Sequence, residues 1–460
     1  MTAGAPRPVA VVDIGKTTAK LALVDPGSGA TLDARTRPNR VLPGPPYPHA
    51  DVEGLWAFIL DGLAAVAGAR PLAGIAVTTH GATAALMAGE VLALPVLDYE
   101  HDGPDDLAAA YAAARPAFAE TLSPRLPGGL NLGAQLFWQA RAFPQAFASA
   151  TAVLMYPQYW TARLTGMRAS EVTSLGCHTD LWAPGAARLS KLVRGQGWEG
   201  LFPPVVPASR VLGPVRAEVA AAAGIDPATP VICGIHDSNA SLLPWLRRAE
   251  PPFTVVSSGT WTVVMTVGGD LAELDPARDS LANVDALGRP VPTARFMGGR
   301  EYAALAGEAP AAAGPGDLAA VLAADVFPLP SFAPGVGPFP HAPGRWHGDP
   351  ATLAPAARTA AADLYLALVT DACLGLAGRG RRIVVEGPLA RNRLYCATLA
   401  ALAGVPVHPS PDATGTSAGA AALLGDATPG ALPPPVEATP VPGLAAFAGR
   451  WRGLATGGAR

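Results

Sequence analysis

Runs of apolar and β-branched residues predict two similar strand–turn–strand units, one at the start of the chain and one past its middle. The first extends over Pro8–Val24 and bends at Gly15-Lys16-Thr17-Thr18. The second pairs strands at Phe253–Ser257 and Trp261–Val267 around the turn Ser258-Gly259-Thr260. Because both turns combine glycine with hydroxyl side chains and lie about half a chain apart, an internal duplication is the simplest interpretation.

Between and after these units, short strands alternate with helices, which indicates an α/β fold in both halves of the chain. Strands are predicted at Gly74–Thr78, Val231–Gly234 and Ile383–Glu386. Helices are predicted near Ala134–Phe143, Glu301–Ala306, Ala351–Leu374, Arg391–Leu402 and Ser417–Leu424.

The hydrophobic pattern is interrupted between Leu246 and Pro252, and we place a domain boundary there. Residues 1–248 are expected to form a first lobe and residues 249–445 a second, since 460 residues are long for a single core. The segment Ala427–Arg460 is rich in proline and glycine, so it should add little to a core. Residues 446–460 are therefore predicted to be a tail.

The amino-acid composition limits the classes of molecule that this protein is expected to bind. The formal net charge is -3, with 15% charged residues and no long basic run, which argues against nucleic acid and against a membrane surface. The four cysteines lie far apart without a Cys-x-x-Cys pair, so neither a zinc site nor a disulfide framework is indicated. No apolar leader or membrane-spanning run is found. We expect a cytoplasmic enzyme with small-molecule partners, and a homodimer remains open.

The first turn contains Gly-Lys-Thr, which also ends the phosphate-binding P-loop motif. That motif requires a glycine five residues earlier, and the residue there is Ala10, inside the predicted strand. What remains is Asp13 at the tip of a strand beside a glycine–hydroxyl turn, a layout suited to holding hydrated Mg²⁺ against phosphate oxygens. Alone, the same residues would also fit an ordinary hairpin.

Four motifs follow one another along the chain. They are Asp13-Ile14-Gly15-Lys16-Thr17-Thr18, Gly234-Ile235-His236-Asp237-Ser238-Asn239-Ala240, Ser257-Ser258-Gly259-Thr260-Trp261, and Glu386-Gly387-Pro388 with Thr416-Ser417-Ala418-Gly419-Ala420-Ala421. Together they resemble the FGGY carbohydrate kinases in order and spacing. The resemblance covers about Val9 to Gly425 and implies an α/β fold with two ribonuclease-H-like lobes of the actin and hexokinase type and a cleft between them. It also implies transfer of the γ-phosphate of ATP to a sugar hydroxyl with Mg²⁺.

By this resemblance, Asp237 is the general base that accepts the proton of the sugar hydroxyl. A carboxylate at the end of the strand Val231–Gly234, ahead of an apolar helix, is also placed to do so. The alternative is a helix N-cap, for which aspartate is a favoured residue. The two roles are compatible with each other.

The resemblance assigns the remaining site residues by class. The first lobe would carry the sugar site and Asp13 as the metal ligand, and the second would bind the nucleotide. ATP and phosphate contacts are expected from Gly15, Lys16, Thr17, Thr18, Gly259, Thr260, Gly299, Gly387, Asn392 and Ser417. Sugar contacts are expected from His80, Gly81, Asp98, Gln135, Glu171, His236 and Asp237.

Two positions depart from the usual family pattern. Lys16 stands where most members have threonine or serine, and it would either reach phosphate oxygens or pair with a nearby carboxylate, with the phosphate role slightly favoured. Glu386 stands where a second glycine is common. His236-Asp237 and the second turn look most like the rhamnulose and fuculose kinases, which favours a ketose, such as a 6-deoxyketose, phosphorylated at carbon 1.

Two other classes of function compete with the sugar kinase. One is a regulator that binds sugar or nucleotide with the same fold and has lost catalysis, and the other is an actin-like or chaperone ATPase. Retention of Asp13, Asp237 and Thr260 favours the kinase over the regulator.

Overall fold

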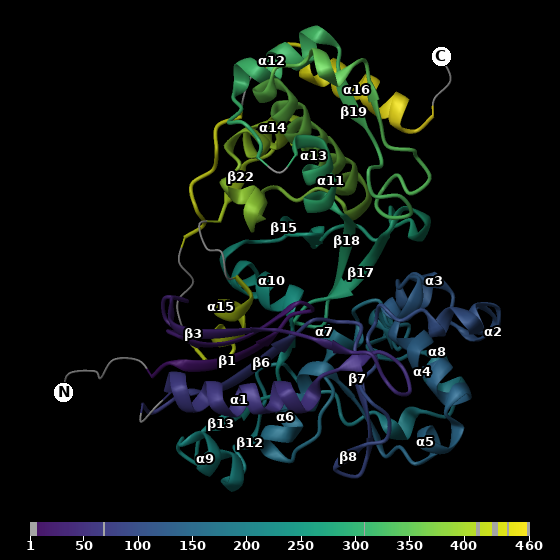
Figure 1. Ribbon diagram of the computed structural model, residues 1–460, viewed down its shortest axis with the longest axis vertical. Helices are drawn as coiled ribbons and strands as arrows, with labels where there is room; N and C mark the ends of the chain where they lie inside the picture. Colours follow the sequence, from purple (N-terminus) through teal and green to yellow (C-terminus); the bar gives the residue numbers. More distant parts are fainter. Residues whose placement is uncertain are drawn as a thin grey trace. The chain divides into compact units, whose positions relative to one another are not determined.

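The computed structural model describes residues 7–67, 70–307, 309–410, 415–425, 431–438 and 441–457 (Figure 1). The chain divides into two compact units. The first contains Met1–Arg247, Asn283–Pro290 and Thr414–Pro429, and the second contains Arg248–Ala282, Val291–Ala413 and Gly430–Arg460. The division falls next to the boundary predicted from the sequence, but two short segments from the second half of the chain join the first unit.

The first unit is built on a seven-stranded sheet. Its strands run in the order β12-β13-β6-β1-β2-β3, and β14 pairs with β6. Both faces are buried, so consecutive residues of β1 enter different cores: Ala10 and Val12 pack with one cluster, and Val9 and Val11 with another. The strands are β1 (Val9–Ile14), β2 (Thr18–Val24), β3 (Thr31–Pro38), β6 (Gly74–Thr79), β12 (Val211–Pro214), β13 (Pro230–Ile232) and β14 (Ile235–His236).

Helices cover the two faces of this sheet. One core takes its helical residues from α1, α6 and α9, and the other takes them from α10 and α15. The helices are α1 (Val52–Ala67), α6 (Tyr156–Thr165), α9 (Ala217–Ala223), α10 (Asp237–Arg248) and α15 (Gly415–Ala422). The chain thus returns to the first unit at α15, which packs on β1 and β6.

The second unit repeats the central strand order of the first. The order β3-β2-β1-β6-β13 is matched by β18-β16-β15-β21-β22, with an antiparallel hairpin and then parallel neighbours in each case. This repetition is the structural form of the duplication predicted from the two hairpins. The strands are β15 (Phe253–Ser258), β16 (Thr262–Val267), β17 (Ser280–Val284), β18 (Pro290–Phe296), β21 (Ile383–Glu386) and β22 (Val407–Pro409).

The core of the second unit is built around one long helix, α13 (Pro355–Ala377). Among the described residues α13 alone has the length and apolar composition of a membrane span, and 89% of its most apolar window is buried inside the structure. It packs against α11 (Gly298–Ala306), α12 (Pro315–Ala324) and α14 (Arg393–Ala403). Its apolar surface is therefore used within the core of the unit.

The predicted tail is wrong over most of its length. Leu444–Ala455 forms helix α16, whose residues Leu444, Phe447, Ala448 and Trp451 lie in the core of the second unit. Their spacing is that of one helix face, and the Trp451 indole donates to the carbonyl of Pro328 at 2.8 Å. The high proline and glycine content of the surrounding segment masked this stripe.

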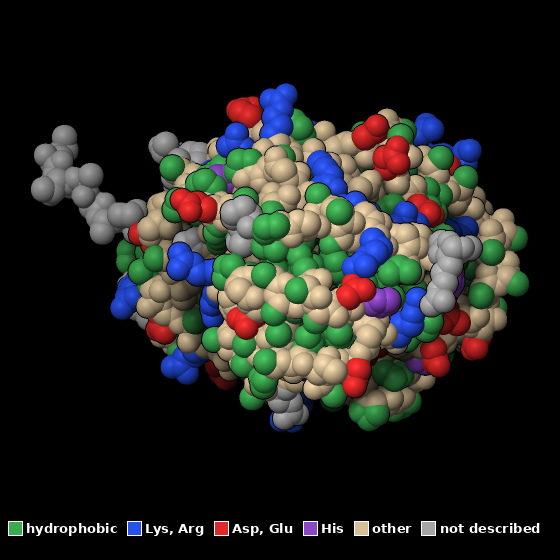
Figure 2. All heavy atoms as spheres, turned by 90° about the horizontal axis from the view of Figure 1, so that it is seen from above, with side chains coloured by type: hydrophobic (Ala, Val, Ile, Leu, Met, Phe, Trp, Pro, Cys, Tyr) green, Lys and Arg blue, Asp and Glu red, His purple; other side chains and the backbone are tan. Residues whose placement is uncertain are grey.

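Charged side chains are interspersed on the face shown in Figure 2, where lysine and arginine alternate with aspartate and glutamate. No large patch of one sign covers that face. This distribution agrees with the small net charge and does not indicate a nucleic-acid footprint.

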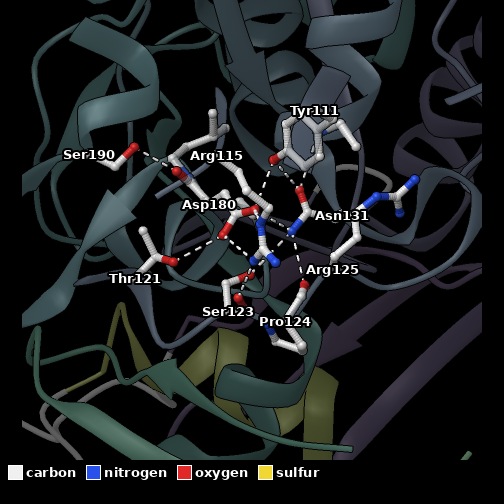
Figure 3. Close-up of polar contacts among 12 residues, drawn as sticks. Tyr111, Arg115, Thr121, Ser123, Pro124, Arg125, Asn131, Asp180 and Ser190 are labelled. Atoms are coloured by element: carbon white, nitrogen blue, oxygen red, sulfur yellow. Dashed lines mark hydrogen bonds and ion pairs between the residues drawn. The ribbon is translucent and has the colours of Figure 1, made fainter. Parts of the chain in front are cut away.

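A buried polar network ties together the helices that the first unit adds beside its main sheet (Figure 3). At its centre, the carboxylate of Asp180 accepts hydrogen bonds from Arg115 (2.8 and 3.0 Å), Tyr111 (2.8 Å), Thr121 (3.0 Å) and Asn131 (3.1 Å). These partners come from α2 (Ala108–Ala114), α3 (Phe118–Thr121) and the residues that flank α2 and α4 (Leu132–Ala142). A buried charge so fully paired holds the segment in one arrangement.

Replacing Asp180 with alanine should therefore lower the free energy of unfolding by about 3–5 kcal/mol, because the Arg115 guanidinium would be left without its counter-charge. Urea unfolding followed by tryptophan fluorescence and by circular dichroism measures this change. Glu90→Ala is the matched control, since Glu90 also pairs with an arginine but is 79% exposed, and it should cost under about 1 kcal/mol. Equal effects of the two substitutions would contradict the role given to the network.

Candidate active site

Three neighbouring parallel strand ends bring the acidic and imidazole side chains of the first unit together. In the register of the sheet, Asp13 of β1 lies opposite Thr78 of β6, and Thr78 lies opposite Ile235 of β14. His80 follows β6 directly, and its amide donates to the carbonyl of Ile14 at 2.9 Å. Because the carboxyl ends of parallel strands meet at one edge, this edge is where an α/β fold places its ligands.

Asp237 lies at this edge, as the first residue of α10. Its Oδ1 accepts hydrogen bonds from the Ser238 amide (2.6 Å) and hydroxyl (3.3 Å), and the side chain keeps 30% of its surface exposed. Burial raises the pKa of the Asp237 carboxyl to about 6, with an opposing effect from His80 and a further increase from Asp13. A carboxylate with this pKa is a stronger base than a solvated aspartate and is still ionised at neutral pH.

His236 lies beside Asp237. The His236 Nε2 is 3.2 Å from Asp237 Oδ1, and Nδ1 is 3.4 Å from the side-chain nitrogen of Asn239. Nε2 also makes a hydrogen-bonding contact of 3.6 Å with Cys177 Sγ. Burial lowers the pKa of His236 to about 4, so the ring is neutral. His236 was predicted to contact the sugar, but its ring is buried and faces the base.

Asp13 is suited to hold a metal together with phosphate oxygens. Its Oδ2 accepts a hydrogen bond from the Ser417 hydroxyl at 2.9 Å and is 3.2 Å from Lys20 Nζ. Both contacts are made by Oδ2, and neither uses the second carboxylate oxygen, Oδ1. Mg²⁺ typically takes one or two carboxylates and completes its shell with phosphates and water. Among the described residues, no group of three or more His, Cys, Asp or Glu side chains could hold a metal ion without other ligands. A metal ion at Asp13 would therefore need phosphate oxygens and water to complete its coordination.

The structure corrects the expected place of Ser417. It was predicted to contact the nucleotide with the residues of the second lobe, whereas it lies in α15, within the first unit, bonded to Asp13. The reason is the return of the chain to the first sheet after β22. The motif that contains Ser417 thus supports the acidic site and forms no part of the pocket of the second unit.

The first turn is closed by its own backbone. The Gly15 amide donates to the carbonyl of Thr18 at 3.0 Å, and the side chains of Thr17 and Thr18 are exposed. Lys16 turns away from this open side and contacts Asp98, which is the pairing alternative considered from the sequence. The turn therefore offers backbone amides and hydroxyl groups to a ligand, while its lysine is engaged elsewhere.

Two of the predicted sugar residues lie beside the base. The His80 ring packs against Tyr99 (5.5 Å between centroids) and Tyr156 (5.2 Å). At Gly81, any Cβ would approach the His236 Nε2 to 2.7 Å, so the backbone can pass only without a side chain. His80 and Gly81 thus border the acidic site, and their contact with the sugar stays a prediction.

Two further predicted sugar residues of this unit, Gln135 and Glu171, are buried supports. Gln135 donates through Nε2 to the carbonyls of Ala82 and Gly129, which fixes the loop after Gly81. Glu171 is fully buried, caps α7 (Val172–Leu175) by accepting from the Thr173 amide at 3.0 Å, and has its pKa raised to about 7 by burial. Neither side chain is open to a ligand, because packing from distant parts of the chain covers both.

The second unit contains a pocket of about 670 Å³, large enough for a nucleoside. Three predicted nucleotide residues line it: Gly259, Gly299 and Asn392. Its wall is mostly apolar and small, with polar groups at a few points. The lining residues are Ser258, Gly259, Thr262, Gly298, Gly299, Tyr302, Pro310, Ala311, Ala312, Ala313, Thr359, Asp363, Leu366, Pro388, Leu389, Arg391, Asn392, Arg393 and Leu394.

At two glycines beside this pocket, two segments of the backbone approach each other closely. A Cβ on Gly299 would lie 2.3 Å from the carbonyl oxygen of Gly259, and the Gly299 amide donates to the carbonyl of Thr260 at 3.2 Å. Gly387 has φ +76°, and its Cβ would lie 2.0 Å from the carbonyl oxygen of Ser258. The predicted nucleotide glycines are thus positions where only glycine permits the close approach of two chain segments.

Asp363, which also lines this pocket, was not predicted from the sequence. It lies on the apolar helix α13 and accepts from the Asn392 side-chain amide at 2.6 Å, and burial raises its pKa to about 6. Its one signal is a charged residue within a long apolar run, which by itself fits many structural roles. Asn392 also caps α14, since its Oδ1 accepts from the Tyr395 amide at 2.9 Å.

Comparison with known proteins identifies the family. Residues 129–244 match the N-terminal domain of the FGGY family of carbohydrate kinases, and residues 250–433 match the FGGY C-terminal domain. The solved structure of a carbohydrate kinase from Novosphingobium aromaticivorans is 35% identical, covers 98% of this chain and 99% of its own, and superposes with a TM-score of 0.91. The chain belongs to the FGGY family of carbohydrate kinases, and the resemblance inferred from the motifs is confirmed.

More distant relatives agree on the fold. A xylulose kinase from Lactobacillus acidophilus is 14% identical over 98% of this chain and 97% of its own, with a TM-score of 0.82. The predicted two-lobed actin and hexokinase type of fold is therefore confirmed. Among curated proteins, L-fuculokinase of Salmonella typhi is 28% identical over 209 residues, which is 43% of this chain and 42% of the length of that protein.

The raised pKa of Asp237 predicts the pH dependence of turnover. If the ionised carboxylate is the base, kcat/KM should fall about tenfold for each pH unit below about 6 and level off above it. A pH profile of initial rates measures this. The variant His80→Gln should keep the inflection or move it slightly upward, because His80 lowers the pKa of Asp237. An inflection near 4 in the wild type would contradict the burial argument.

Gly387→Ala should weaken nucleotide binding about tenfold or more, because the new methyl group must displace the carbonyl of Ser258 at the edge of the pocket. Titration with ATP by calorimetry measures the change in Kd. The matched control is Gly404→Ala, because Gly404 has a similar φ of +68° with nothing within 4 Å of its Cβ position. If both variants bind ATP equally well, the close approach at Gly387 is irrelevant to the pocket.

Proposed function

We propose that this protein is an ATP-dependent kinase that transfers the γ-phosphoryl group to a hydroxyl of a neutral ketose, with Asp237 as general base. The observation that carries the proposal is the half-buried Asp237 carboxylate, held at a sheet edge beside Asp13 by hydrogen bonds from Ser238. A structural helix cap needs neither a raised pKa nor a second carboxylate beside it.

In the proposed reaction, the sugar hydroxyl donates its proton to the Asp237 carboxylate as its oxygen attacks the γ-phosphorus. The bond from phosphorus to the bridging oxygen breaks, and ADP leaves with that electron pair. Asp13 would hold Mg²⁺, which neutralises charge on the phosphates when bound. The amide and hydroxyl of Ser238 donate to Asp237 Oδ1 and hold the base in place, while the neutral ring of His236 lies 3.2 Å from the same oxygen.

The proposed nucleotide site is the pocket of the second unit. Its apolar wall and the Asp363–Asn392 pair suit a base and a ribose, since such pockets combine apolar walls with a few placed polar groups. The turn at Gly259 and the amide of Gly299 lie at its edge. The exposed hydroxyls of Thr17 and Thr18 in the first turn remain candidates for phosphate contacts.

The charged side chains at the edge of the first sheet favour an uncharged sugar as the phosphate acceptor. Three carboxylates, those of Asp13, Asp98 and Glu100, contact the two ammonium groups of Lys16 and Lys20, and the Asp237 carboxylate has no ammonium partner among the described residues. The remaining negative charge would repel a sugar acid. The similarity to L-fuculokinase over part of the chain, and the His-Asp pair at the base, support a 6-deoxyketose such as fuculose phosphorylated at carbon 1.

Asp237→Asn should reduce kcat by about 10²- to 10⁴-fold, because the amide keeps the shape of the side chain but cannot take up the proton. An ADP-release assay with ATP, Mg²⁺ and a panel of ketopentoses, 6-deoxyketoses, hexuloses and sugar acids measures it. Asp61→Asn, on the exposed side of α1, is the control and should match the wild type.

The same panel decides between functions. A kinase shows ADP release that depends on one neutral sugar and is lost in Asp237→Asn. If no sugar raises ADP release above the level of that variant, the proposed activity is wrong. ADP release that is independent of every sugar would indicate an ATPase instead.

A further inference from the structure

The ammonium group of Lys16 is enclosed by three consecutive residues of another loop. Its Nζ contacts Asp98 Oδ1, lies 3.5 Å from Glu100 Oε2, and stands 4.4 Å from the centre of the Tyr99 ring. We refer to Asp98, Tyr99 and Glu100 as the lysine cage. The cage joins the first turn, between β1 and β2, to a segment more than eighty residues further along the chain.

The cage leaves little of the lysine for a phosphate. The Lys16 side chain is 21% exposed and that of Asp98 is 10% exposed, so their pair is largely removed from water. Moving the ammonium to a phosphate would break this pair and the contact with the aromatic face, and would leave the Asp98 carboxylate partly buried without a counter-charge. Glu100 adds less, because it is mostly exposed.

The cage is anchored by backbone hydrogen bonds and by a ring contact with His80. The Asp98 amide donates to the carbonyl of Pro48 at 2.9 Å, and the Asp98 carbonyl accepts from the His101 amide at 2.9 Å, so the backbone is fixed on both sides of the carboxylate. The Tyr99 ring packs edge-on against His80. His80 in turn acts electrostatically on Asp237. Contacts thus run from Lys16 through the cage to His80.

We propose that Lys16 is a positioning residue for the acceptor sugar, which fixes the Asp98 carboxylate to accept a sugar hydroxyl and holds Tyr99 against His80, and that it is not a phosphate ligand. This inference rests on the proposed kinase function. Under this proposal, Lys16 in the first turn contributes to the affinity of the protein for the sugar. In the described part of the chain, Asp98 Oδ2 has no hydrogen-bond partner, so it is the oxygen left for the sugar.

Lys16→Met, which keeps the length of the side chain and removes its charge, tests the proposal. We expect the KM for the best ketose of the panel to rise about tenfold or more, while the Kd for ATP, measured by calorimetry without sugar, changes by less than about twofold. Lys191→Met is the matched control, because Lys191 is 74% exposed, and it should change neither value. A tenfold weaker Kd for ATP with an unchanged sugar KM would overturn the proposal.

A conservative variant and a double variant separate positioning from general destabilisation. Lys16→Arg keeps the charge and should restore most of the sugar affinity, which a merely structural loss would not predict. If Lys16 acts through the cage, Asp98→Asn combined with Lys16→Met should raise the sugar KM no further than Asp98→Asn alone. Fully multiplicative effects would show that the two residues act separately and would overturn the proposal.

The outcomes also distinguish this inference from the proposed function. If the wild type phosphorylates no sugar, the kinase proposal fails, and the Kd for ATP of Lys16→Met still decides whether the lysine binds phosphate. If the wild type is an active kinase and Lys16→Met has the sugar KM of the wild type, the kinase stands and the positioning role is wrong.

Discussion

The chemistry proposed for the first unit depends on one partly buried carboxylate. Asp237 retains its charge at neutral pH although most of its surroundings favour the neutral form, and burial is the main cause of its raised pKa. Its neighbours then set the balance: His80 lowers that pKa, Asp13 raises it further, and the hydrogen bonds from Ser238 lower it. The role of base proposed for Asp237 depends on this environment, since the same residue at the start of an exposed helix would only cap it.

That environment follows from the topology of the sheet. Asp13, His80 and Asp237 come from three segments far apart in sequence, and the parallel pairing of β1, β6 and β14 brings their ends to one edge. The second unit repeats the same strand order and uses its corresponding edge differently, with glycines and a pocket in place of the acidic cluster. One duplicated framework therefore supports two kinds of ligand site, each fixed by the side chains at its strand ends.

The sequence predicted the parts that depend on local pattern and motif: the alternating α/β elements, the repeated hairpins, the family and the position of Asp237. It failed where distant packing decides. Gln135 and Glu171 carry suitable polar groups, yet segments remote in sequence bury both. Ser417 was assigned to the nucleotide lobe because its motif follows β22, and only the return of α15 to the first sheet places it on Asp13. Asp363 had no local signature, because one acidic residue in an apolar helix does not reveal the pocket beside it.

The central claim is that this protein moves a phosphoryl group from ATP to a sugar hydroxyl and not to water. Phosphorus NMR of a mixture of the protein, ATP, Mg²⁺ and L-fuculose, or the best ketose of the panel, follows the transferred group itself. The account predicts a new phosphomonoester resonance, coupled to the protons of carbon 1, that grows in step with ADP. Formation of ADP and inorganic phosphate without any phosphomonoester would contradict it.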